Sequence, residues 1–146
     1  MVLQKEQKVI QVIDMEKRLL YARYHSAGHL LSMVVNQLYP ELDGYKGNHF
    51  PGQAFVIFEG KFTDDLLISL KDKLSNFVNE TVKRNLPVLI EWKDKVRTIG
   101  FAGFSKTYPC GGTHVKNTSE IGEIIIRNIK KDKDNKSNLR IGYDIR

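Results

Sequence analysis

Residues 108–115 read Tyr-Pro-Cys-Gly-Gly-Thr-His-Val, and residues 23–31 read Arg-Tyr-His-Ser-Ala-Gly-His-Leu-Leu. The first stretch places a cysteine and a histidine on either side of two glycines and a threonine. The second places His25 and His29 at positions i and i+4, which lie above one another on one face of a helix. A helix and a loop can therefore bring three imidazoles and one thiol to a single point.

These four side chains form a candidate metal site. Zinc prefers nitrogen and sulfur ligands arranged as a tetrahedron. The chain has one cysteine, Cys110, which can form no internal disulfide and is available as a thiolate ligand. Three of the chain's four histidines lie in the same two stretches as this cysteine. The sequence therefore predicts one zinc ion per chain, held by His25, His29, Cys110 and His114.

Two common zinc proteins do not fit this pattern. The zinc protease motif needs a glutamate directly after its first histidine, and position 26 is a serine. A zinc finger needs its ligand pairs close together in sequence, whereas these two pairs are far apart in a chain with a core of its own.

Composition limits the remaining possibilities. With 146 residues, of which 41% are hydrophobic, the chain can build one core, so we expect a single domain over residues 1–146. It has no apolar run of membrane-spanning length, and its first residues lack the apolar core of a signal peptide, so we expect a cytoplasmic protein. The net charge of +6 suits an anionic partner such as RNA.

Hydrophobic periodicity predicts the first half of the fold. The β-branched residues 9–13 predict a strand, and a 3.6-residue repeat predicts a helix over residues 21–38, stopped by Pro40. Residues 41–60 predict a hairpin that turns at Pro51-Gly52. Thr63 is the expected N-cap of a second helix, which ends near Asn85.

The second half predicts strands. Residues 88–92 form one, residues 98–104 are weakly extended, and residues 121–129 and 139–145 form two more around the polar turn 130–138. Strands joined by hairpins predict an α+β fold in which an antiparallel sheet packs with two main helices.

Beyond its chemistry, the pairing of residues 25–31 with residues 110–115 resembles a known family. It is similar to the editing domain of alanyl-tRNA synthetase and to the free-standing AlaX proteins, in their short form. The resemblance covers residues 9–145, including Asp14 and Arg18 before the helix and Gly-Asn-His-Phe at residues 47–50. The threonyl-tRNA synthetases carry a related domain, but the Cys-Gly-Gly-Thr-His run favours the alanyl branch.

The resemblance implies the fold of the threonyl/alanyl-tRNA synthetase second additional domain and a zinc-dependent trans-editing hydrolase. Its substrate would be alanine tRNA mischarged with serine, or with glycine, and its partner the aminoacylated 3′ end of that tRNA, with no role for DNA or membrane. Two alternatives stay open: editing of another mischarged tRNA of the threonine type, and a non-catalytic, zinc-stabilised tRNA-binding module. The sequence does not specify the oligomeric state.

Five further residues are candidates for the substrate pocket. The hydroxyls of Ser26 and Thr113 could contact the substrate or orient water, or could only fill a helix face and a loop; Ser26 stands where threonine is common in the family. Gly111 and Gly112 could form an oxyanion hole or only shape the loop. His49 could carry protons or contact tRNA, or could be a solvent-facing loop residue.

The role of the metal and the recognition of tRNA stay open in the sequence. Zinc could activate a water or hold the substrate's amino group, and the first route needs a fifth position or a weakly held His114. Compared with longer family members, the chain is expected to lack an N-terminal β-domain and a C-terminal extension. Cations on the catalytic domain would then contact the acceptor stem, and the candidates are Arg18, Arg23, Lys46, Lys116 and Arg140.

Overall fold

The structure is a computed structural model that describes all residues, 1–146. Its elements follow in the order α1 (Met15–Leu38), β1 (Asp43–Asn48), β2 (Phe55–Glu59), α2 (Asp64–Lys83), β3 (Val88–Lys93), β4 (Val96–Phe101), β5 (Tyr108–Pro109), the 3₁₀ turn η1 (Thr118–Ile121), β6 (Ile124–Lys131) and β7 (Leu139–Ile145). The predicted α+β class is confirmed. No helix is long and apolar enough to cross a membrane.

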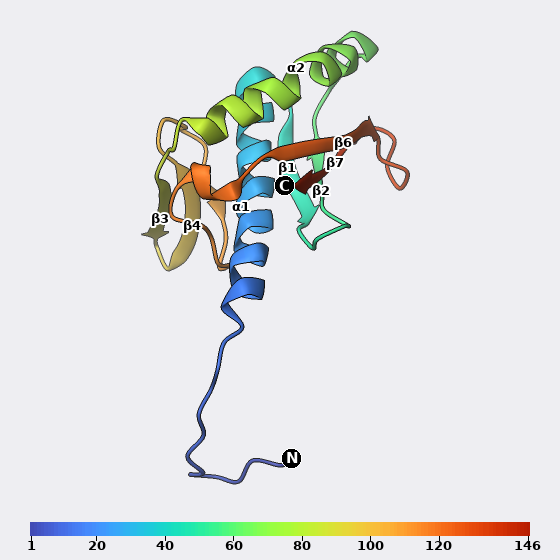
Figure 1. Ribbon diagram of the computed structural model, residues 1–146. Helices are drawn as coiled ribbons and strands as arrows, with labels where there is room; N and C mark the ends of the chain where they lie inside the picture. Colours follow the sequence, from blue (N-terminus) through green and yellow to red (C-terminus); the bar gives the residue numbers. More distant parts are fainter.

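The strands form two antiparallel sheets, whereas the sequence predicted one. The larger sheet has the order β1-β2-β7-β6, and the smaller one has the order β3-β4-β5. In Figure 1 the two sheets lie on either side of α1. The smaller sheet matters for function because its last strand, β5, leads directly into the Cys110 loop.

Helix α1 is the centre of the core. Ala27, Leu30, Leu31 and Val35 are completely buried, and the helix contacts β1, β2, β7 and α2. The two helical histidines are therefore carried on the best-packed element of the chain. The second helix begins as predicted, because the Thr63 side chain accepts a hydrogen bond from the backbone N–H of Leu66, 3.1 Å away.

The predicted strand at residues 9–13 is wrong. These residues have no strand partner, and Ile10 and Val12 are 94% and 88% exposed. In Figure 1 the segment runs away from the body of the molecule. A strand needs a neighbour to satisfy its backbone groups, and residues 9–13 pair with no strand of either sheet.

Other element boundaries also differ from the prediction. Helix α1 begins at Met15 rather than at residue 21, so Arg18 lies inside the helix; the Asp14 side chain caps it by accepting from the backbone N–H of Lys17. The missed turns carry exposed apolar side chains, Met15 and Leu19, which blur the helical pattern. The strand expected over residues 121–129 begins at Ile124 and runs to Lys131, after the short turn η1.

Candidate metal centre

The four predicted ligands meet at one point. Helix α1 delivers His25 and His29, and the loop after β5 delivers Cys110 and His114. The four donor atoms all lie within 4.8 Å of one another. All four residues are half-buried, so the fold shields the cluster in part.

Three of the distances between donor atoms match those expected around one metal ion. The Cys110 Sγ lies 3.4 Å from the His25 Nε2 and 3.3 Å from the His114 Nε2, and the Nε2 atoms of His25 and His29 are 3.3 Å apart. Two donors on a zinc-sized ion lie roughly 3.3–3.8 Å apart, given bond lengths of about 2.0–2.3 Å. The cluster could therefore hold a metal ion.

The three ligand histidines are neutral at pH 7. Burial, together with the neighbouring His25, lowers the pKa of His29 to about 2 and that of His114 to about 3. Burial also lowers the pKa of His25. A metal ion binds the neutral imidazole, so these histidines do not have to lose a proton before they bind a metal.

Ser26 lies behind His114. Its side chain is completely buried, and its Oγ accepts a hydrogen bond from the backbone N–H of Val115 and lies 3.1 Å from the His114 Nδ1. With the Ser26 oxygen as acceptor, the Nδ1 carries the ring proton and the Nε2 keeps its lone pair toward Cys110. Hydrogen bonds of this kind orient metal-binding histidines.

The two glycines of the loop differ in importance. A Cβ at Gly112 would overlap the ring of His25, whereas a Cβ at Gly111 would meet nothing within 4 Å. Neither glycine has a positive φ. The close approach to His25, rather than an unusual backbone angle, therefore explains the glycine at position 112. The Gly112 N–H points at the Cys110 Sγ, 3.4 Å away.

Arg97, on β4, binds the backbone of the loop that carries Cys110. Its Nη1 donates to the carbonyl oxygens of Cys110 and Gly112, at 3.0 and 2.8 Å. The guanidinium thus fixes the residues that flank Gly111, and its positive charge also lowers the pKa of His25 and of His114. No sequence pattern predicts this role, because a lone arginine in a charged connection is typical of a surface turn.

His49 joins the cluster as a fourth imidazole. Its ring centroid lies 5.1 Å from that of His25 and 5.9 Å from that of His29. The His49 Nδ1 lies 2.8 Å from the Tyr143 hydroxyl, which donates to the backbone carbonyl of Tyr24 and so accepts from the imidazole. Burial, with the nearby His25, lowers the pKa of His49 to about 4. The ring is therefore neutral at pH 7, and its Nε2 can accept a hydrogen bond.

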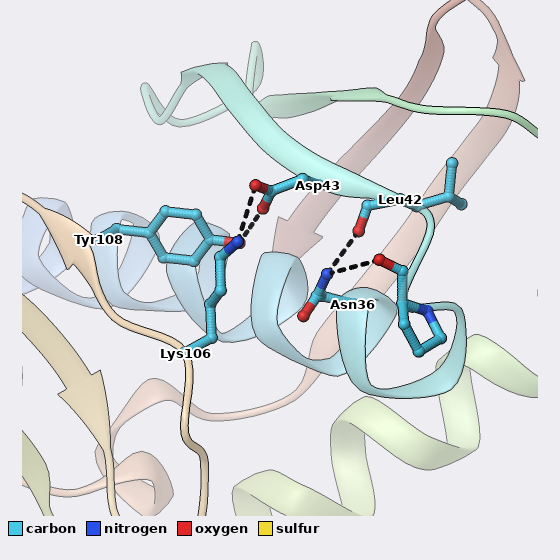
Figure 2. A network of polar contacts seen from close by, with 6 residues as sticks. Asn36, Leu42, Asp43, Lys106 and Tyr108 are labelled. Carbon is cyan, nitrogen blue, oxygen red and sulfur yellow. Dashed lines mark hydrogen bonds and ion pairs between the residues drawn. The ribbon is translucent and has the colours of Figure 1, made fainter.

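A second polar network holds the Cys110 loop against β1. Figure 2 shows the Asp43 carboxylate accepting from the Lys106 ammonium at 2.7 Å and from the Tyr108 hydroxyl at 2.9 Å. Asn36 donates to the carbonyl of Leu42, at 2.8 Å, and so fixes the chain just before Asp43. The Tyr108 ring in turn lies 5.9 Å from His29, between centroids.

This network forms one wall of a polar hollow of about 480 Å³. His29 and His49 line the hollow at the cluster, and Ser32, Asp43 and Tyr108 line it further away. Burial and the hydrogen bond to Asp43 raise the pKa of Tyr108, so its hydroxyl stays protonated. Sequence reasoning missed Asp43, Tyr108 and Tyr143, because single polar residues in strands carry no local pattern.

The five predicted cations lie in different places. Arg18 and Lys116 line a hollow of about 530 Å³ together with the exposed Thr113 and the two loop glycines. Arg23 is half-buried, and its guanidinium is occupied by donating to the backbone carbonyls of Ile121 and Arg146. Lys46 and Arg140 lie on the larger sheet.

The fold and the cluster define an α+β domain with a candidate metal site shared between its central helix and the loop that follows β5. Residues 96–142 match the family described as the threonyl and alanyl tRNA synthetase second additional domain. The chain is 31% identical to the alanyl-tRNA editing protein AlaX-L of Pyrococcus horikoshii over 88% of its own length. It is also 31% identical to AlaX-M of the same organism over 77% of its length, and 32% identical to the alanine–tRNA ligase of Pseudothermotoga lettingae over 79%.

These comparisons confirm the predicted resemblance: the chain is similar to alanyl-tRNA editing proteins and to part of an alanine–tRNA ligase. It spans only part of each relative, with 35% of AlaX-L, 51% of AlaX-M and 15% of the ligase covered.

Proposed function

We propose that this protein is a zinc-dependent hydrolase that removes serine, and also glycine, from mischarged alanine tRNA. The observation that carries the proposal is the convergence of His25, His29, Cys110 and His114 in a chain related to alanyl-tRNA editing proteins. Three imidazoles and a thiolate are the donor set that zinc prefers. When bound, zinc would supply positive charge to polarise the ester or to make a water more acidic.

His49 is the residue that we propose to act on the attacking water. Its Nδ1–H is held by the Tyr143 hydroxyl, which leaves the Nε2 as an acceptor beside the cluster. A neutral imidazole at this position can accept a hydrogen bond from a water and align it with the ester. Gly28 permits the close approach of α1, because a Cβ there would overlap the His49 ring.

The polar hollow is the proposed pocket for the amino acid. Its wall offers the hydroxyls of Ser32 and Tyr108 and the carboxylate of Asp43. The Ser32 and Tyr108 hydroxyls already donate to the Gly28 carbonyl and to Asp43, so each offers a free lone pair that a serine hydroxyl can use and an alanine methyl cannot. Glycine has no side chain, so it would leave this space to a water that makes the same contacts.

Ser26, Arg97 and Gly112 are positioning residues in this proposal. Ser26 sets the tautomer of His114, while Arg97 and Gly112 fix the loop beside His25. The Gly111 N–H remains a candidate oxyanion donor, since the Gly112 N–H is directed at the cysteine sulfur. We also propose that residues 1–146 act as one domain with one zinc ion.

A deacylation panel tests the function. Alanine tRNA charged with serine, glycine or alanine, and threonine tRNA charged with serine, would be incubated with zinc-loaded protein, with and without a chelator. We expect rapid hydrolysis of serine and glycine from alanine tRNA, little hydrolysis of alanine, and loss of activity with the chelator and in Cys110→Ala and His29→Ala.

The other outcomes separate the alternatives. The family that matches residues 96–142 includes threonyl synthetases, so preferential hydrolysis of seryl-threonine tRNA would assign the threonine-type activity. Folded, zinc-loaded protein that binds tRNA but hydrolyses none of the four substrates would contradict the proposal and indicate a binding module.

A further inference from the structure

Residues 9–13 are exposed although their side chains favour a strand. They read Val-Ile-Gln-Val-Ile, and the four aliphatic side chains are between 50% and 94% exposed. None of these residues takes part in a hydrogen bond of the structure. An apolar, β-branched run gains stability only where a neighbouring strand pairs with its backbone and covers its side chains. The single chain therefore holds one strand-forming segment without a partner.

Three of the four sheet edges are protected against pairing with another strand. The edge strand β1 contains a bulge, and β5 is only two residues long. The edge strand β6 carries three cations, Arg127, Lys130 and Lys131. Bulges, short length and charge are the features by which proteins keep an edge strand from pairing. The fourth edge, formed by β3, has none of the three to the same degree.

The strand β3 presents a regular and largely apolar edge. Its six residues pair with β4 without a bulge. Leu89, Ile90 and Trp92 are 41%, 39% and 70% exposed. The charged residues of β3, Glu91 and Lys93, are of opposite sign and give the edge no net charge. An exposed edge of this composition is a site at which a further strand can add.

The outer side of β3 has room for one short strand. At its start, the Val88 N–H donates to the Lys116 carbonyl at 2.8 Å, and this pairing goes no further along β3. Alternate residues of a strand direct their backbone groups to the same side. The N–H and C=O groups of Ile90 and Trp92 therefore face outward as those of Val88 do. The free edge, residues 89–93, has the same length as segment 9–13.

The direction of segment 9–13 identifies whose edge it reaches. The Asp14 side chain caps α1 by accepting from the Lys17 N–H at 3.1 Å, and this cap sets the direction in which the segment leaves the helix. In Figure 1 the segment leads away from the body of its own chain. We propose that two copies of this chain exchange residues 9–13, each adding the segment as a strand to β3 of the other. The exchange is closed and symmetric, and it does not depend on the proposed function.

The exchange brings the partner copy to the candidate site. Val88 and Ile90 line the same hollow as Arg18, Thr113 and Lys116. A strand paired with Ile90 lies along the rim of that hollow. The partner's segment therefore forms part of the surface beside the Cys110 loop.

Association at rising protein concentration tests the exchange. Sedimentation equilibrium of the full chain should show a dimer of twice the chain mass of 16.8 kDa. Trp92 is the only tryptophan, so its fluorescence reports on the β3 edge alone. Because the added strand covers Trp92, its emission should move to shorter wavelength as the dimer forms.

Variants of the segment and of the edge should weaken the dimer separately. In Ile10→Pro/Gln11→Pro, one of two consecutive prolines always removes an N–H directed at β3. One lost hydrogen bond in each exchanged segment should raise the dissociation constant about tenfold, and Trp92→Lys should do the same. The matched controls are Val2→Pro/Leu3→Pro, outside the segment, and Ile68→Lys, which charges an exposed position on α2. Both should associate like the wild type.

Mixing the two weakened variants sharpens the test. Neither variant alone can form an intact pairing, whereas a mixed dimer regains one, so the mixture should associate more tightly than either variant. Three results would overturn the proposal. They are a wild-type chain that stays monomeric, whether its tryptophan is exposed or covered, a dimer that persists unchanged in both variants, and a mixture that associates no better than its components.

Discussion

At the scale of single residues, the metal centre depends on the space between His25 and the loop that faces it. Gly112 leaves that space open because a Cβ there would overlap the His25 ring, whereas a Cβ at the neighbouring Gly111 would touch nothing. We expect Gly112→Ala to push the His25 ring aside and to lower zinc affinity at least about tenfold, as displaced ligands do. Gly111→Ala is the matched control and should leave affinity unchanged. Competition with a chromophoric chelator measures both, and equal affinities in the two variants would refute this explanation.

Ser26 provides a second test at the same scale. Ser26→Ala removes the partner of the Val115 N–H and of the His114 Nδ1. Leaving a buried group without a partner costs about 1–3 kcal/mol of unfolding free energy, and losing the orientation of a ligand lowers metal affinity about 10–100-fold.

Ser32→Ala is the control for this variant, because Ser32 is also buried on α1 but donates only to the Gly28 carbonyl. Denaturant unfolding and zinc titration would show a stability loss in both variants and a loss of affinity in Ser26→Ala alone. Undiminished zinc affinity in Ser26→Ala would remove its positioning role.

The sequence predicted the four candidate ligands, but it did not predict the residues that hold those ligands in position. Histidines at i and i+4, and a cysteine near a histidine, form local patterns whose chemistry is recognisable without a structure. Arg97 and Tyr143 act on the site through long-range contacts to a carbonyl or an imidazole. Such contacts depend on how strands pair, which single residues do not reveal.

At the scale of elements, the Cys110 loop is attached to β1 through Tyr108 and Asp43 (Figure 2). Tyr108→Phe removes one hydrogen bond and should cost about 1 kcal/mol of stability. It should also weaken zinc binding several-fold, because the segment that leads to Cys110 loses one of its two contacts with Asp43 and keeps only that of Lys106.

Tyr39→Phe is the matched control for Tyr108→Phe. Its hydroxyl donates to Ser69 at 2.6 Å, between α1 and α2 and outside the cluster. Thermal unfolding should show a similar loss of stability in the two variants, and isothermal titration should show weaker zinc binding in Tyr108→Phe only. Unchanged zinc affinity in Tyr108→Phe would mean that the loop does not need this contact.

The elements with strong local signals were predicted well. The helix α2, with its Thr63 cap, the hairpin of β1 and β2, and the last strand all occur where the sequence indicated. Residues 9–13 were assigned wrongly because β-branched residues favour a strand only where a neighbouring strand exists. The separate smaller sheet was missed because pairing of β4 with the two-residue strand β5 has no sequence signature.

At the scale of the whole molecule, buried histidines make the metal-free protein sensitive to acid. The pKa values of His29, His114 and His49 fall to about 2, 3 and 4 in the folded state, against about 6.5 in the unfolded chain. Below pH 6.5 the unfolded state therefore binds protons that the folded state does not, and the free energy of unfolding decreases.

We expect the stability of chelator-treated protein to be level above pH 7 and to fall steadily from pH 6.5 to pH 4. Urea unfolding at a series of pH values measures it. Replacing His49, which is not among the four predicted ligands, with glutamine should make the fall shallower. Stability that does not change between pH 7 and pH 4 would contradict the neutral, buried state of these imidazoles.

The central claim is that zinc bound at the cluster is required for ester hydrolysis. Single-turnover deacylation of alanine tRNA charged with serine, measured at increasing zinc occupancy, tests this claim most directly. Protein stripped of metal would be reloaded in steps, with zinc content and rate measured on the same samples. The account predicts that the rate rises with bound zinc, levels off at one zinc ion per chain and is absent in Cys110→Ala. A rate in fully stripped protein equal to that in loaded protein would contradict it.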